Sequence, residues 1–200
     1  MTRPRVLTHL IDATRVALTD VEGEPAKAAA RRIFSALERP AEYVGADPLE
    51  TLESCRHLDM ALSNARAGPA PIAALADAFE AAQPLMSWQR RADAEAHGDS
   101  FYHGHANTWL VGPDAPERRD DVIVGASLVA PGVDYPEHNH APEELYVVMS
   151  EGQWYAEDRG WYTPGVGGIV YHTPGVTHAM RSGATPLFAI WCLWCGESQS

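Results

Sequence analysis

Residues 132–146 read GVDYPEHNHAPEELY, a stretch that combines two closely spaced histidines with a glutamate and a tyrosine. His138 and His140 are two positions apart, so both imidazoles leave the same face of an extended chain. Glu144 and Tyr146 repeat that relation on the next stretch. Burying such polar groups without a partner is costly, and a divalent ion neutralises and organises them. The stretch therefore predicts a metal centre on the inner face of a β structure.

Residues 173–178 read TPGVTH and end in a histidine at a predicted junction of turn and strand. His178 can therefore supply a fourth protein ligand. His172 lies just before this turn, and strand parity leaves open whether it faces the interior. His103 and His105 form a second H-x-H without a carboxylate at matching spacing, so we expect structural or rim positions for them.

These two segments resemble the two motifs of the cupin superfamily, G-x5-H-x-H-x3,4-E-x6-G and G-x5-P-x-G-x2-H-x3-N. The first motif matches in order and spacing at Gly132, His138, His140 and Glu144, and the second at Gly167, Gly175 and His178. Gly152 closes the first motif one residue late, Thr173 replaces the usual proline and Ser182 the usual asparagine. The resemblance implies a small cupin β-barrel, a double-stranded β-helix or jelly roll, with the metal inside it.

Within that superfamily, residues 135–146, the later histidine and the helical N-terminal part resemble the Q-type dimethylsulfoniopropionate (DMSP) lyases. Members of that family cleave DMSP to acrylate and dimethyl sulfide. The resemblance implies four metal ligands, which are His138, His140, Glu144 and His178. It also implies that Tyr135 and Tyr146 are the catalytic candidates.

The chemistry of this elimination suits such residues. Removal of the weakly acidic proton α to the substrate carboxylate is the difficult step, and a metal stabilises the charge that develops. A tyrosine with an ordinary pKa of about 10 is a poor base unless a nearby cation favours its phenolate. We favour Tyr135 as the base and Tyr146 as the tyrosine beside the metal, but the sequence leaves the reverse assignment open.

The sulfonium end of the substrate is positively charged, and aromatic faces bind such groups. The candidates for this role are Trp191, Trp194 and Tyr102. Trp191 and Trp194 are three apart on the last predicted strand, so at most one of them faces the interior. Trp109, Trp154 and Tyr171 are better explained as core residues.

Two other functions stay open. A cupin oxygenase holds Fe(II) with the same three-histidine, one-glutamate set, and a non-catalytic cupin binds a metal or a small ligand without turning it over. The residue types also leave the metal open: Zn²⁺ or Fe²⁺ is expected first, with Mn²⁺, Co²⁺ and Ni²⁺ as alternatives. The oligomeric state is not determined by the sequence.

Outside the motifs, the chain divides into two parts. Residues 1–97 are predicted to form a helical segment packed on the barrel, and residues 98–200 the metal-binding barrel. Helices are predicted around 7–18, over 26–37 after Pro25, from Asp47–Pro48 through 62, over 71–82, and over 85–91 after a break at Pro84. Strands are predicted over 101–111, 122–129, 144–150, 153–157, 168–171, 178–181 and 187–195.

Composition limits the remaining possibilities. The chain has 200 residues and a formal charge of −12, which disfavours nucleic acid as a partner. No stretch has the length and hydrophobicity of a membrane span, and charged residues near the start argue against a signal peptide, so we expect a cytoplasmic enzyme of a small zwitterionic molecule. The C-x-x-C formed by Cys192 and Cys195 has no second pair and is expected to consist of packed thiols.

Overall fold

The computed structural model describes residues 2–45 and 50–196. The α-helices are α1 (Arg5–Ala17), α2 (Glu24–Leu37), α3 (Leu58–Arg66), α4 (Ala70–Ala82) and α5 (Asp99–Gly104), with short 3-10 turns η1 (Glu53–His57), η2 (Gln83–Leu85) and η3 (Ala94–His97). The first strands are β1 (Glu42–Tyr43), β2 (Trp88–Gln89), β3 (His105–Val111), β4 (Glu117–Arg118), β5 (Val122–Val129) and β6 (Asp134–His138). They are followed by β7 (Glu143–Val148), β8 (Gln153–Ala156), β9 (Gly160–Tyr162), β10 (Ile169–His172), β11 (His178–Arg181) and β12 (Leu187–Trp194).

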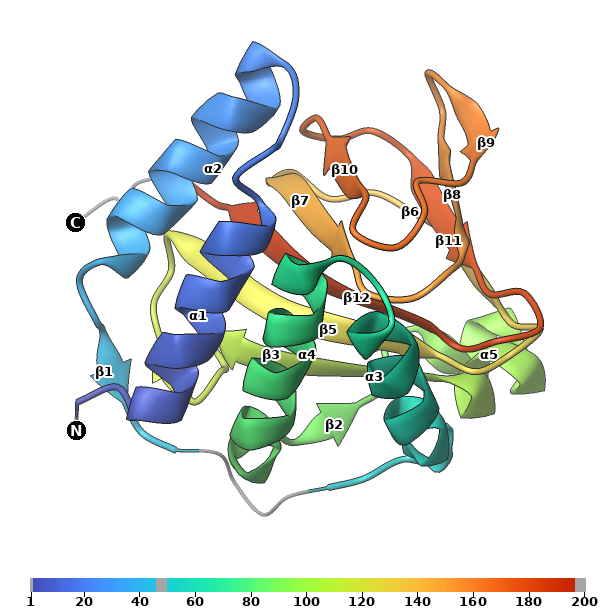
Figure 1. Cartoon of the computed structure of the whole chain (residues 1–200). Coiled ribbons are helices and arrows are strands. Elements are labelled where there is room, and N and C mark those ends of the chain that lie inside the picture. Colours follow the sequence, from blue (N-terminus) through green and yellow to red (C-terminus); the bar gives the residue numbers. More distant parts are fainter. Residues whose placement is uncertain (1, 46–49, 197–200) are drawn as a thin grey trace.

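The strands form two sheets that face each other. The larger sheet has the order β1-β4-β3-β5-β12-β7-β10, with β2 added beside β3, and the smaller has the order β6-β11-β8-β9. Figure 1 shows α1, α3 and α4 over one face of the larger sheet, while the smaller sheet lies apart from them. The expected fold class, mainly β with N-terminal helices, is confirmed, and the expected barrel takes the form of these two facing sheets in the part of the chain described.

Strand β12 shows how alternating side chains build the two cores. Phe188, Ile190 and Cys192 belong to the hydrophobic cluster shared with the helices. Ala189, Trp191 and the other odd-numbered residues of β12 belong to a second cluster, which also contains side chains of the smaller sheet. Because successive side chains of a strand point to opposite faces, one apolar strand serves both layers. The inner space between the sheets is where the predicted site residues of β7 must lie.

Some element predictions were wrong. The strand predicted from residue 101 begins only at His105, because residues 99–104 form α5 behind Gly98, whose φ of 85° suits glycine. The predicted helix over 85–91 is instead the end of η2 followed by the short strand β2. The helix predicted from Asp47–Pro48 begins at η1 and continues as α3, and Asp47 and Pro48 lie outside the described residues. Strand β6, which carries Tyr135 and His138, was missed as an element.

The N-terminal segment is fastened to the sheet by a buried ion pair. The Arg3 guanidinium donates to both carboxylate oxygens of Glu117 at 2.5 and 2.7 Å, and the two side chains are 5% and 0% exposed. Ala41 N also donates to this carboxylate at 2.9 Å. The helical cluster and the larger sheet share one hydrophobic core, although the boundary predicted after residue 97 stays a prediction.

This ion pair gives the first testable prediction. We expect Glu117→Ala to lower the free energy of unfolding by about 3–5 kcal/mol, because it leaves the Arg3 charge buried without its partner. Arg15→Ala is the matched control, since its partner Asp12 is half exposed and such pairs contribute less than about 1 kcal/mol. Urea unfolding of both variants measures the difference. Equal midpoints for the two variants would contradict a structural role for the Arg3–Glu117 pair.

In the described part of the chain, none of the helices has both the length and the apolar character needed to cross a membrane.

Candidate metal centre

Glu144 and Tyr146 occupy inward positions of β7. In the register of the sheet, Glu144 pairs with His172 of β10 and Tyr146 pairs with Trp191 of β12. Glu144 is 3% exposed and Tyr146 is 2% exposed. The strand-parity argument for these two residues therefore predicts their common face correctly, and it places a carboxylate inside the apolar space between the sheets.

His140 reaches the same space from a loop. Strand β6 ends at His138, and His140 lies in the connection to β7. The backbone oxygen of His140 accepts a hydrogen bond of 2.9 Å from Gly175 N, which ties this loop to the turn before His178. Gly175 has a φ of 78°, a conformation that favours glycine in such a turn. The two motifs are thus joined through backbone contacts, and His140 lies in a loop beyond the strand that carries His138.

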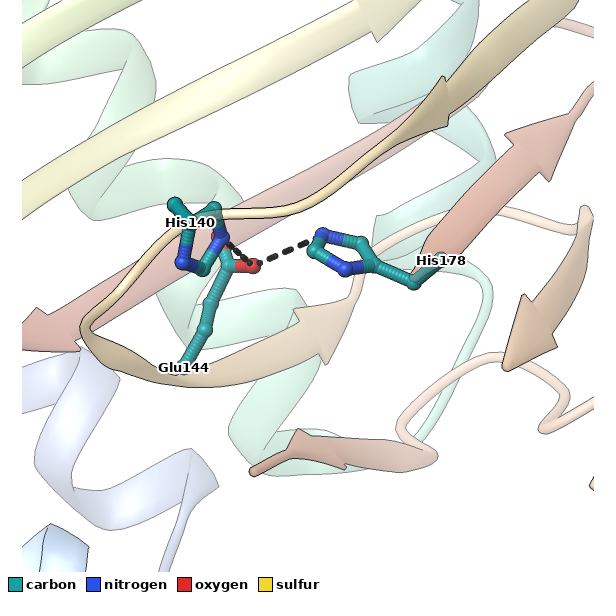
Figure 2. A group of neighbouring side chains, drawn as sticks. All are labelled: His140, Glu144 and His178. Atoms are coloured by element: carbon teal, nitrogen blue, oxygen red, sulfur yellow. Dashed lines mark hydrogen bonds and ion pairs between the residues drawn. The ribbon is translucent and has the colours of Figure 1, made fainter. Parts of the chain in front are cut away.

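His140, Glu144 and His178 form a compact group (Figure 2). His140 Nε2 lies 2.9 Å from Glu144 Oε2, and His178 Nε2 lies 3.3 Å from the same oxygen. Among the described residues, the potential ligand atoms of these three side chains lie within 4.8 Å of one another. The group could hold a metal ion, and its nitrogen and oxygen donors suit a divalent transition metal.

The outer nitrogens of the three site histidines support this assignment. Each Nδ1 lies within hydrogen-bond distance of the carbonyl oxygen of a residue two positions away: His138 with Pro136 (2.9 Å), His140 with Pro142 (2.8 Å) and His178 with Val176 (3.0 Å). A carbonyl only accepts, so each Nδ1 carries a proton and Nε2 is the ring nitrogen left for other contacts. Nε2 of His140 and Nε2 of His178 face the Glu144 carboxylate, where they could bind a metal ion together with it. Such orientation of ligating rings by backbone carbonyls is typical of metal sites.

His138 lies beside this group. Its ring centroid is 4.2 Å from that of His178 and 6.3 Å from that of His140, and its backbone pairs with His178 across β6 and β11. The structure therefore brings three of the four predicted ligands within bonding range of one centre, and the ligand role of His138 stays a proposal.

The pKa values of Glu144, His140 and His138 depend on their neighbours in the group. Burial would raise the pKa of Glu144, but hydrogen bonds with His140 and His178 outweigh it and lower this pKa to about 2. Burial opposes protonation of His140, yet the hydrogen bond and charge of Glu144 raise its pKa. For His138, burial and then the neighbouring His178 lower the pKa to about 4. The carboxylate is thus held in its ionised form, ready to bind a cation.

His172 faces the interior, which settles the orientation that the sequence left open. Its ring stacks on His178 with centroids 4.2 Å apart, and it is 1% exposed. Neither of its ring nitrogens has a hydrogen-bond partner among the described residues. Burial first, and then the charge of His178, lowers its pKa to about 3, so the ring is neutral. A molecule bound beside the group could form hydrogen bonds with these two buried ring nitrogens of His172.

Both candidate tyrosines are buried near the group. Burial and then the negative charge of Glu144 raise the pKa of Tyr146 well above its ordinary value. Burial also raises the pKa of Tyr135, but a hydrogen bond from Asn107 and the charge of Arg91 oppose the shift. Tyr135 contacts His138, with ring centroids 5.2 Å apart, and the Arg91 guanidinium lies 5.2 Å from its ring.

The three proposed sulfonium-binding aromatics lie in different places. Trp191 shares the inner face with Tyr146 and packs edge-on against Trp109. Trp194 packs against the core shared with the helices, with the Arg32 guanidinium 5.9 Å from its ring. Tyr102 lies in α5 under Arg90, whose guanidinium is 4.2 Å from its ring centroid. The rings of Trp194 and Tyr102 thus already face an arginine side chain of this protein.

The other sequence candidates have structural surroundings. His105 is buried, stacks on Phe101 at 3.7 Å and accepts a hydrogen bond from Arg91 N at its Nε2. His103 is exposed and pairs with Glu53 at 2.5 Å. Cys192 is buried, which raises the pKa of its thiol to about 12, whereas Cys195 is exposed. The burial of His105 and Cys192 agrees with the expected structural roles, but the expectation that both thiols of the C-x-x-C are packed was wrong for Cys195, which is exposed.

A groove of about 730 Å³ lies away from the metal-binding group, between α1, the start of α4 and the β8–β9 hairpin. Tyr171 lines it and donates a hydrogen bond of 2.8 Å to Glu143, on the helix-facing side of the larger sheet. Tyr162 also lines the groove and packs against the inner cluster, whereas His140, Glu144 and His178 do not line it.

Asn107 and Ser127 are inward-facing residues that the sequence reasoning missed. Asn107 Nδ2 donates to Tyr135 Oη at 3.1 Å, and Ser127 Oγ donates to Asn107 Oδ1 at 2.7 Å. Ser127 interrupts the otherwise apolar strand β5, and this interruption was an available signal, whereas β3 also carries His105 and Thr108, so Asn107 did not stand out in the sequence.

Comparison with known proteins gives a consistent set of relatives. The family model described as dimethylsulfoniopropionate lyase matches residues 26–189. Dimethylsulfoniopropionate lyase DddQ from Ruegeria pomeroyi is 30% identical over 129 residues, a match that spans 64% of this chain and 64% of that relative. The match thus covers slightly less than two thirds of the relative's own length.

Two solved structures have the same fold as this chain. A crystal structure from a study of the DMSP lyases RdDddP and RnDddQII has a TM-score of 0.71 and 23% identity, covering 94% of this chain and 92% of that one. The crystal structure of DMSP lyase DddQ from Ruegeria pomeroyi has a TM-score of 0.68 and 21% identity, covering 99% and 95%. At these identities the structures establish the fold alone, including the N-terminal helices.

Proposed function

The chain belongs to the dimethylsulfoniopropionate lyase family, and we propose that it cleaves DMSP to acrylate and dimethyl sulfide in a metal-dependent elimination. The observation that carries the proposal is the group of His140, Glu144 and His178, with two Nε2 atoms directed at one buried carboxylate oxygen. Its location between the sheets excludes most bulk water, which strengthens electrostatic stabilisation there.

We propose His140, Glu144 and His178 as the metal ligands, with His138 as a further ligand or close neighbour. When bound, a divalent metal such as Zn²⁺ or Fe²⁺ supplies Lewis-acid stabilisation of negative charge on the substrate carboxylate. The protein holds these side chains in place through the carbonyl contacts of their Nδ1 atoms. The residue types leave Mn²⁺, Co²⁺ and Ni²⁺ as other possible occupants.

Tyr135 is assigned as the base that removes the proton α to the substrate carboxylate. Tyr135 acts as its phenolate, formed by release of its own proton to solvent: the phenolate oxygen takes the α-proton, the C–H electron pair forms the new C=C bond of acrylate, and the C–S bond breaks to release dimethyl sulfide. Tyr146, two residues from Glu144 on the same face of β7, is assigned a place beside the metal. The inner face of Trp191 is proposed for the sulfonium end, since its ring shares the side of Tyr146. Trp194 and Tyr102 are weaker candidates because a guanidinium already covers each ring.

Headspace detection of dimethyl sulfide from purified protein and DMSP tests this function. We expect release that is independent of oxygen and that falls by at least about 100-fold after chelation, because metal stabilisation contributes several kcal/mol. Adding back single divalent metals should restore release and identify the effective ion. Coupled consumption of O₂ would instead indicate an oxygenase. Absence of release with every metal, despite metal binding, would indicate a non-catalytic cupin.

A further inference from the structure

A chain of buried hydrogen bonds crosses the larger sheet and ends on Tyr135. Trp191 Nε1 donates to Ser127 Oγ at 3.0 Å, Ser127 Oγ donates to Asn107 Oδ1 at 2.7 Å, and Asn107 Nδ2 donates to Tyr135 Oη at 3.1 Å. These residues lie on β12, β5, β3 and β6, so the last bond joins the larger sheet to the smaller one. All four residues are between 3% and 7% exposed.

The chemistry of these side chains determines which atom donates and which accepts in each of the three hydrogen bonds. An indole N–H only donates, so the Ser127 hydroxyl accepts it and uses its own proton on the Asn107 oxygen. The Asn107 amide then presents its N–H to Tyr135. In this direction each of the three donors has an acceptor, as buried polar groups require. Every proton of the chain is directed toward the phenol oxygen.

We infer that Asn107 and Ser127 are positioning residues for Tyr135: the Asn107 N–H fixes the phenol oxygen and stabilises its phenolate form, the form that takes the α-proton of the substrate. The inference rests on the proposed role of Tyr135 as base. A donor fixed on the oxygen also persists when the oxygen becomes charged, and hydrogen bonds to ionised oxygens are about twice as strong as neutral ones. The chain therefore supports the phenolate that acts as the base, rather than substrate binding.

Neighbouring residues provide a matched control. Thr108 follows Asn107 on β3, is fully buried, and its Oγ1 has no hydrogen-bond partner among the described residues. Thr108→Val therefore changes a polar side chain to an apolar one of the same shape, one position away, without breaking a hydrogen bond. This variant therefore shows how much a buried substitution in β3 changes turnover when no hydrogen bond is lost.

The kinetic test compares Asn107→Leu, Ser127→Ala, Ser127→Thr and Thr108→Val. Because a hydrogen bond to an ionised oxygen is strong, its loss leaves less of the Tyr135 phenolate, and we expect Asn107→Leu to lower kcat by about 10- to 100-fold with KM within about twofold. Ser127→Ala should lower kcat less, Ser127→Thr should recover most of it, and Thr108→Val should match the parent. If Tyr135→Phe abolishes turnover while Asn107→Leu and Ser127→Ala keep the kcat of Thr108→Val, the inference is overturned.

A second measurement does not depend on turnover. Urea unfolding of Asn107→Leu, Tyr135→Phe and the double variant tests whether the two side chains interact in the folded protein. We expect the double variant to lose less stability than the two single losses together. Fully additive losses would overturn the hydrogen-bonded chain, whatever the reaction. Retained turnover in Tyr135→Phe would instead contradict the proposed base, so the two failures are distinguishable.

Discussion

Glu144→Gln is expected to remove bound metal and to lower kcat/KM by on the order of 10³-fold, because several kcal/mol of transition-state stabilisation depend on the metal. The substitution keeps the shape of the side chain but removes the charge that both His140 Nε2 and His178 Nε2 face. A neutral amide can offer one oxygen to a metal, yet it cannot balance its charge. Metal content by elemental analysis and dimethyl sulfide release measure the two losses together.

Glu143→Gln is the matched control for this experiment. Glu143 precedes Glu144 on β7 but points toward the helices, where it pairs with Arg32 and accepts a hydrogen bond from Tyr171. We expect the parent metal content and turnover within about twofold, since a partly exposed ion pair of this kind contributes about 1 kcal/mol or less to stability. Parent metal content in Glu144→Gln, or equal loss in the two variants, would contradict the assignment of Glu144 as a ligand.

The sequence was sufficient to place Glu144 and Tyr146 on the same face of β7. Glu144 and Tyr146 share parity, and the alternation of a strand places both on one face without knowledge of its neighbours. The parity of a strand does not extend to His140, because β6 ends at His138 and His140 lies in a loop whose backbone oxygen accepts a hydrogen bond from Gly175 N. The approach of these residues depends on backbone contacts between distant segments, which no local pattern specifies.

The aromatic residues show a second limit. Phe101 and Tyr102 favour strand by intrinsic preference, but they form a short helix that packs Phe101 on His105. Parity correctly separates the faces of Trp191 and Trp194, yet it cannot show that Arg32 lies near the Trp194 ring. Ser127 interrupts the apolar strand β5, but only the fold brings Asn107 of β3 to Tyr135 across the gap between two sheets. Tertiary packing therefore decides which polar residues join the site.

Tyr135→Phe is expected to lower kcat by about 10²- to 10⁴-fold, the contribution typical of a general base, while metal content stays at the parent level. The phenol oxygen of Tyr135 is the end of the Asn107 hydrogen bond, and removing it deletes the proposed proton acceptor without touching His140, Glu144 or His178. Tyr171→Phe is the matched control, because Tyr171 faces the helices and bonds to Glu143. Its turnover should equal that of the parent.

Tyr146→Phe separates the two tyrosine roles. A tyrosine beside the metal is expected to change metal affinity as well as turnover, because Tyr146 is two residues from Glu144 on the same face of β7. The measured pair is therefore kcat at saturating metal and the metal dissociation constant for each variant. Tyr135→Phe with near-parent turnover, together with Tyr146→Phe that keeps its metal but loses turnover, would assign the base to Tyr146. Loss of turnover at full metal occupancy in Tyr135→Phe alone assigns it to Tyr135, since only the base affects the proton step without affecting the metal.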